Sequence, residues 1–163
     1  MMATWSEAFA TQAASDLQTF ELLTKTSLPQ SHRLHYLQMW MEKLCKASVY
    51  TENIESLKNT HNVVAKILPR LIQEHWGRIG LERRPRIAEI QAICKEIDLL
   101  HPQIDSDGRR PDNVEYPWNR PAGEVAIPAL WKFPLSARLN SPGGRLLLKA
   151  ASRLTGRLAT PVR

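Results

Sequence analysis

The stretch SHRLHYLQMWMEKLCKASVY, residues 31–50, predicts the helix around which the rest of the chain is organised. Its apolar side chains recur every three or four residues, the spacing of one helix face: Leu34, Leu37, Met41 and Leu44. The opposite face is polar and carries Gln38, Glu42, Lys43 and Lys46. Glu42 precedes Lys46 by four residues, the better orientation for a helical ion pair. We therefore expect an amphipathic helix that packs against other helices for most of its length.

Similar periodicity predicts four further helices, at about 5–25, 60–76, 85–100 and 145–156, so that residues 31–50 form the second of five. The first two are joined by a short turn at Pro29 and are expected to run antiparallel. Pro69 falls inside the third and is expected to kink or divide it, because proline lacks the amide hydrogen. The sequence thus predicts a single all-α domain over 1–163, a four- to five-helix up-and-down bundle.

The segment 101–134 differs from the rest because it is rich in Pro, Gly, Asp and Asn but keeps its aromatic residues. Disordered segments are poor in aromatics, so we expect a long ordered loop before the last helix, with Tyr116 and Trp118 at least partly buried. Three arginines flank these rings and are expected to stay accessible: Arg109, Arg110 and Arg120. Such interleaving of cations and aromatics suits nucleic-acid recognition. The alternative is that the two rings only plug the end of the bundle.

Composition narrows the possible functions. The formal net charge is +6 and the pI is about 9.6, which permits a polyanionic partner such as nucleic acid. The two cysteines, Cys45 and Cys94, lack zinc-site spacing and are expected to be buried free thiols. The five histidines show no metal-ligand spacing, so no metal or other cofactor is expected. No long apolar run or secretory signal is recognisable, which favours a cytoplasmic protein without a membrane partner.

The order of these features resembles the HEPN family (higher-eukaryote-and-prokaryote nucleotide-binding domains). The pattern Gln38…Glu42-Lys43…Lys46-Ala47 resembles the family's second-helix signature. His61 opens the next apolar helix, and an arginine-rich turn leads into the fourth. Tyr116-Pro117 follows that helix, and a last helix with small residues at Ala150-Ala151 closes the chain.

The resemblance implies a helical bundle that usually dimerises. It also implies a role in prokaryotic defence or toxin–antitoxin assemblies, where many members are ribonucleases that use an arginine and a nearby histidine. Arg70 and His75 are the formal match here. Leu71 stands where a polar residue is expected, and no histidine follows His101. These departures favour a non-catalytic module that binds nucleic acid or nucleotide, or docks onto a protein partner.

Two other functions remain open: a metal-independent HEPN ribonuclease toxin that uses Arg70 and His75, and a helical adaptor that binds protein alone. A further phosphate site is conceivable at the start of the organising helix, where Arg33 and His35 lie near free backbone amides. Solvated residues of the capping turn are the alternative there.

Overall fold

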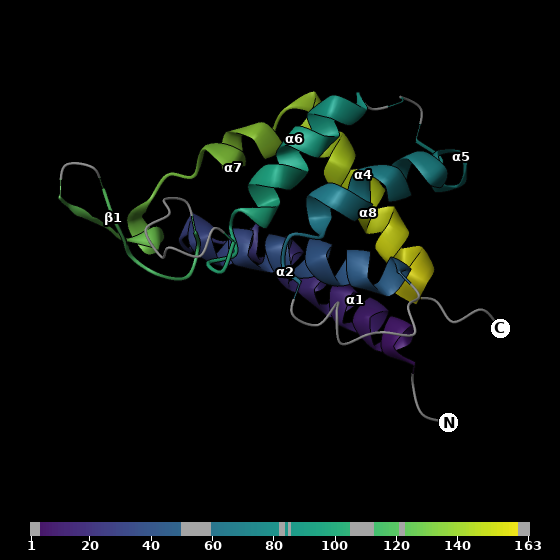
Figure 1. The fold of residues 1–163 in the computed structure, drawn as a ribbon, viewed down its shortest axis with the longest axis horizontal. Coiled ribbons are helices and arrows are strands. Elements are labelled where there is room, and N and C mark those ends of the chain that lie inside the picture. Colours follow the sequence, from purple (N-terminus) through teal and green to yellow (C-terminus); the bar gives the residue numbers. More distant parts are fainter. Residues whose placement is uncertain are drawn as a thin grey trace.

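The computed structural model describes residues 4–49, 60–81, 84, 86–104, 113–120 and 123–159 (Figure 1). The all-α prediction is confirmed, since helices account for most of these residues. In chain order the helices are α1 (Trp5–Leu23), α2 (Gln30–Ser48), α4 (Val64–Glu74), α5 (Trp76–Ile79), α6 (Ile87–Asp98), α7 (Pro134–Leu139) and α8 (Pro142–Ala159). A two-residue antiparallel pair, β1 (Trp118–Asn119) with β2 (Val125–Ala126), and a 3-10 turn, η1 (Pro128–Leu130), complete the set.

Helices α1 and α2 form the expected antiparallel hairpin and lie side by side (Figure 1). Thr4 caps α1 through a capping box with Glu7, which satisfies amides that a helix start leaves unpaired. Farther along, Lys43 Nζ lies 2.6 Å from Asp16 Oδ2, and the rings of Phe20 and Trp40 pack with centroids 5.7 Å apart. These contacts fix the register of the two helices.

Helix α2 is the centre of the molecule, because α4, α6 and α8 cover the side that α1 leaves open (Figure 1). Its apolar residues are almost completely withdrawn from solvent and meet the spines of the covering helices. The largest fully buried side chains of this core include Trp40, Leu34, Leu37, Met41, Leu44, Leu68, Ile72, Ile90, Ile93, Ile97 and Leu147. The predicted organising role of residues 31–50 is thus confirmed for the described part, which ends at Val49.

Two predicted boundaries need correction. Pro69 lies inside α4 without dividing it, so the kink alone stays a prediction, and the break between α4 and α5 falls at His75. The last helix begins at Pro142 rather than near residue 145, because proline is well suited to the first turn of a helix. A separate short helix, α7, precedes it within the region that we had expected to lie between the long loop and the last helix.

Candidate functional site

The polar face of α2 is buried, and this is the main departure from an ordinary amphipathic helix. Gln38, Glu42 and Lys46 are only 1%, 7% and 4% exposed. They satisfy one another along the helix: Gln38 Nε2 donates to Glu42 Oε2 at 2.7 Å, and Lys46 Nζ donates to Glu42 Oε1 at 2.7 Å. Buried polar groups need such partners, since an unpaired one costs free energy. The expected Glu42–Lys46 ion pair therefore exists, but in the interior of the fold.

Glu42 is held in its ionised form by this arrangement. Burial acts to raise the pKa of its carboxyl, but the hydrogen bond and charge of Lys46, together with the amide of Gln38, bring that pKa below its ordinary value. The carboxylate therefore keeps a negative charge inside the protein at neutral pH.

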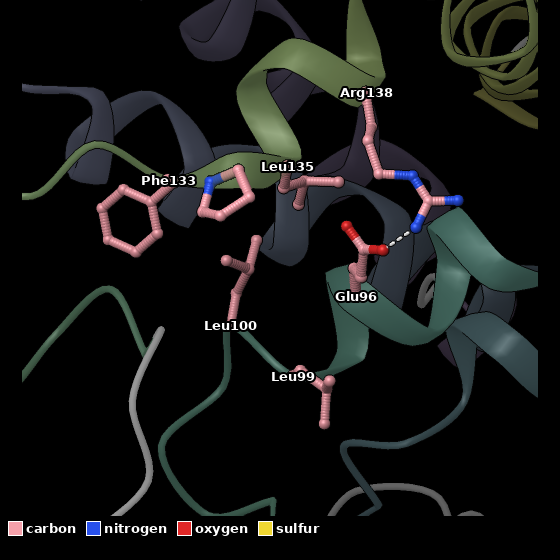
Figure 2. A pocket seen from close by; sticks show the side chains of 7 residues that line it. Glu96, Leu99, Leu100, Phe133, Leu135 and Arg138 are labelled. Carbon is pink, nitrogen blue, oxygen red and sulfur yellow. Dashed lines mark hydrogen bonds and ion pairs between the residues drawn. The ribbon is translucent and has the colours of Figure 1, made fainter. Parts of the chain in front are cut away.

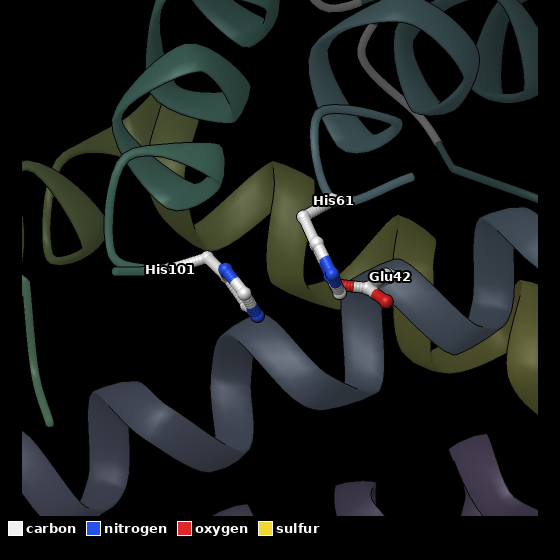
Figure 3. Close-up of side chains that lie close together, drawn as sticks. All are labelled: Glu42, His61 and His101. Carbon is white, nitrogen blue, oxygen red and sulfur yellow. The ribbon is translucent and has the colours of Figure 1, made fainter. Parts of the chain in front are cut away.

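Two histidines from distant parts of the chain meet this carboxylate, as Figure 3 shows. His61 lies just before α4 and His101 just after α6. Their imidazole rings stack with centroids 3.7 Å apart and planes inclined by 10°. His61 Nδ1 lies 3.4 Å from Glu42 Oε2. One donor atom from each of Glu42, His61 and His101 can be chosen so that all three lie within 4.8 Å of one another.

The hydrogen bonds distinguish the two rings. The backbone amide of Gln103 donates to His101 Nδ1 at 3.2 Å, so this nitrogen carries a lone pair. Burial, with the neighbouring His61, lowers the pKa of His101, which favours the neutral imidazole. One carboxylate and two imidazoles at this spacing can bind a cation or hold a proton. We refer to Glu42, His61 and His101 together as the His–Glu cluster.

Sequence reasoning missed the His–Glu cluster because its members come from three separate elements. No spacing rule relates positions 42, 61 and 101. The available signal was the four-residue repeat of Gln38, Glu42 and Lys46, which are able to satisfy each other in a buried row.

The cysteines lie where the sequence predicts. Cys45 and Cys94 are free and buried. Burial raises the pKa of both thiols, so they stay protonated and are poor nucleophiles and metal ligands.

Arg70 and His75 lie near the end of α4. The Arg70 side chain is 70% exposed and pairs with Glu74 at 3.3 Å, while His75 is the C-terminal cap of α4. Five residues along a helix turn about 140° away from each other around its axis, so the two side chains leave α4 in different directions. Within the described part of the chain no hydrogen bond or ion pair joins them, and their catalytic role stays a prediction.

The recognition loop is described only in part. Arg109 and Arg110 lie outside the described residues. Trp118 is buried as expected, at 3% exposure, and packs edge-on against Trp131. The expected burial of Tyr116 is wrong, because this residue is 61% exposed. Val114 and Trp118 fill the interior on either side of the bend that contains it.

Arg120 is exposed, as predicted, but engaged. Its Nη1 lies 2.9 Å from Glu124 Oε2, and its guanidinium lies 5.6 Å from the centre of the Trp131 ring. The start of α2 is engaged as well: Arg33 Nη2 donates to Ser136 Oγ at 3.3 Å, and His35 Nδ1 lies 3.4 Å from Glu115 Oε1. Arg33 and His35 thus connect α2 to α7 and to the loop.

A row of cations lies along α8. Arg145, Lys149, Arg153 and Arg157 follow one another at four-residue steps, and all four are exposed. Helix α8 contains no Asp or Glu. We refer to these four residues as the α8 basic row. The four-residue spacing of these cations is visible in the sequence, whereas the sequence analysis predicts the binding surface in the loop.

The guanidinium groups of the row are oriented by neutral partners. Arg153 Nη1 donates to the carbonyl oxygens of Ile79 and Gly80, at 2.5 and 2.6 Å, and Arg157 Nη1 donates to that of Arg78 at 2.7 Å. These bonds position the side chains over α5. Since a carbonyl carries no net charge, the positive charge of each arginine remains uncompensated by them.

A hollow continues this surface beyond the start of α8. Arg84, Arg86 and Arg145 line it, together with Glu89 and the first turn of α8. Apart from Glu89, the charged side chains that line the hollow are basic, so the positive surface extends from α8 to the N-terminal end of α6.

A second pocket, between α6 and α7, is apolar (Figure 2). Its volume is about 170 Å³, and Leu99, Leu100, Phe133 and Leu135 form most of its wall. Glu96 and Arg138 complete the lining and form an ion pair with each other. The other lining side chains are apolar and include no nucleophile.

Comparison with protein-family models, with curated proteins and with solved structures found no match to this chain. Within the described residues, none of the helices has the length and apolar character that a membrane span requires.

Proposed function

We propose that this chain is a nucleic-acid-binding module whose main contact surface is the α8 basic row. The observation that supports the proposal most is the distribution of charge. Seven of the 22 Lys and Arg residues and none of the 16 Asp and Glu residues lie after Glu124. The preceding residues therefore carry 15 basic and 16 acidic side chains, and the net positive charge belongs to the C-terminal part.

The geometry of α8 suits a phosphate backbone. A four-residue step advances about 6 Å along a helix, so the row presents a line of cations rather than one point charge. Arginine donors arranged along such a line can each meet a separate phosphate, and the counterions released by that contact favour binding. This function agrees with the non-catalytic HEPN-like module that the sequence pattern suggests, within a defence or toxin–antitoxin assembly.

The test is fluorescence anisotropy with labelled single-stranded RNA, single-stranded DNA and duplex DNA over a range of salt concentrations. We expect Lys149→Gln/Arg157→Gln to weaken binding and to make the plot of log K against log salt shallower by about 2. The matched control is Lys25→Gln/Lys66→Gln, which removes the same charge from two exposed positions, one just after the end of α1 and one on α4. Equal weakening by both pairs, or no binding at low ionic strength, would refute the proposal.

A protein partner is a second candidate function, favoured by a separate observation. Tyr116, Val125, Ile127 and Leu130 are 61%, 61%, 47% and 80% exposed around the β1–β2 hairpin. Exposed apolar residues gathered in one segment mark protein contacts more often than isolated ones do. Size-exclusion chromatography with light scattering, on the parent and on Ile127→Ser/Leu130→Ser, tests whether this segment mediates self-association.

A further inference from the structure

The His–Glu cluster joins three segments that are far apart in the sequence. Glu42 lies on α2, His61 precedes α4 and His101 follows α6, and all three side chains point into one small region (Figure 3). The three are partly or fully buried, with the two histidines more accessible than Glu42. A carboxylate and two imidazoles brought together in this way are potential ligands for a metal ion.

The spacing of two of the three donors is already that of metal ligands. Two ligand atoms at about 2.1 Å from a tetrahedral zinc ion lie about 3.4 Å apart. His61 Nδ1 and Glu42 Oε2 are 3.4 Å apart, which is long for a charge-assisted hydrogen bond. The pair can therefore accept an ion between its two atoms with little displacement.

His101 has to move to complete such a site. The largest distance among the three donors reaches 4.8 Å at most, and the nearly parallel rings direct their lone pairs side by side rather than toward one point. His101 lies in the turn after α6 and is partly exposed, and its Nδ1 accepts a hydrogen bond from the Gln103 amide. Metal binding therefore requires this ring to rotate so that one nitrogen points toward the other two donors.

The charge state of the cluster suits a cation. Glu42 is ionised and oriented by Lys46 and Gln38, as buried metal-binding carboxylates are by their own partners. Lys46 holds Oε1, while Oε2 accepts a hydrogen bond from Gln38 and also faces His61 Nδ1 at 3.4 Å. The positive charge of the Lys46 ammonium also repels a metal ion bound next to Glu42, so we expect the metal to bind with moderate rather than very high affinity.

We propose that Glu42, His61 and His101 bind a transition-metal ion, with Zn²⁺ as the representative case. Imidazole ligands select zinc, nickel, cobalt and copper, whereas Mg²⁺ and Ca²⁺ prefer sites made of oxygen atoms alone. Three protein ligands leave a coordination position open for water or an anion. Bound metal ties α2, α4 and α6 together and raises the stability of the folded chain, since the unfolded chain does not hold the three ligands in place.

The test uses purified full-length chain with any affinity tag removed and with bound metal stripped by a chelator. We expect ZnCl₂ to raise the melting temperature and to release heat in titration calorimetry, and MgCl₂ to do neither. His101→Asn and His61→Gln are expected to weaken zinc binding at least tenfold. His32→Asn, which changes an exposed histidine at the start of α2, is expected to bind zinc as the parent does.

Cobalt distinguishes this site from the two cysteines. The parent with CoCl₂ is expected to show visible absorption of a nitrogen- and oxygen-ligated ion without the charge-transfer band of a thiolate ligand. This measurement needs no variant, so it stands even if a histidine variant fails to fold. The proposal is overturned if zinc, cobalt and nickel all leave the melting temperature and calorimetric baseline unchanged, if the thiolate band appears, or if folded His101→Asn binds zinc as tightly as the parent.

Discussion

Trp40 on α2 donates its indole Nε1 hydrogen to Thr155 Oγ1 on α8, at 2.7 Å, across 115 residues of sequence. The Thr155 hydroxyl in turn donates to the carbonyl oxygen of Ala151 at 2.9 Å. Both side chains are buried, at 1% and 2% exposure. The last helix, with its basic row, is thereby attached to the central helix through a polar contact inside the core.

Removing this hydroxyl tests the strength of the attachment. Thr155→Val keeps the shape of the side chain but leaves the Trp40 donor buried without a partner. We expect the free energy of unfolding to fall by about 1–3 kcal/mol, measured by urea denaturation. Thr155→Ser keeps the hydroxyl and is expected to lose less. Equal stability of the Val variant and the parent would mean that the indole finds another acceptor.

Asp98, at the end of α6, caps α4 from outside that helix. Its carboxylate oxygens accept hydrogen bonds from the backbone amides of Val64 and Ala65, at 3.0 and 2.9 Å. Burial nevertheless raises the pKa of this carboxyl to about 6, against an ordinary 3.8, because the two amide bonds offset the cost of burying the charge only in part.

The raised pKa of Asp98 predicts a pH dependence of stability with a definite sign. Between these two values the folded state binds a proton more tightly than the unfolded state does, so stability falls as pH rises from about 4 to about 6. Over this pH interval the free energy of unfolding is expected to fall by an amount on the order of 3 kcal/mol. We expect Asp98→Asn, compared with the parent at each pH by urea denaturation, to lack this decline. A difference of opposite sign would mean that the amide bonds outweigh burial.

The framework of the fold was predictable because it depends on local pattern. The apolar spacing of Leu34, Leu37, Met41 and Leu44, with a short connection to α1, requires an antiparallel helical hairpin. The burial of Gln38, Glu42 and Lys46 was not predictable in the same way. Their polarity indicates a solvated face, and only the covering by other helices makes their mutual hydrogen bonds necessary.

The candidate site was harder to predict than the fold. His61 and His101 meet because α4 and α6 pack against each other, and neither position carries a local sign of the other. Tyr116 and Trp118 looked equivalent as aromatic anchors in one loop. The chain bends after Asn113, whose Oδ1 accepts hydrogen bonds from the amides of Glu115 and Tyr116. This bend leaves Tyr116 exposed, whereas Trp118 is buried.

The two aromatic residues of the loop are therefore expected to differ in their effect on stability. Trp118→Ala removes a buried ring from its contacts with Trp131 and Phe133 and should cost about 3–5 kcal/mol. Tyr116→Ala changes an exposed side chain and should cost less than about 0.5 kcal/mol. Thermal denaturation measures both. If Trp118→Ala keeps its melting temperature but loses RNA binding, Trp118 is a stacking surface rather than an anchor.

Two of the glycines of α8 lie in opposite surroundings. A Cβ on Gly144 would fall onto the backbone carbonyl of Arg138 and lie 2.5 Å from Leu139 Cα, so the close approach of α7 to α8 requires glycine there. A Cβ on Gly156 would meet nothing within 4 Å. We expect Gly144→Ala to destabilise the fold by about 1–3 kcal/mol or more, since backbone has to move to admit the methyl group.

Gly156→Ala is the matched substitution in the same helix, and it is expected to stabilise the protein by about 0.5–1 kcal/mol, because alanine loses less backbone freedom than glycine on forming a helix. Urea denaturation of the two variants under identical conditions measures the contrast. The two substitutions are expected to change the free energy of unfolding in opposite directions because of packing alone, since both residues belong to one helix and undergo the same chemical change. A Gly144→Ala variant as stable as Gly156→Ala would show that α7 is free to shift away from α8.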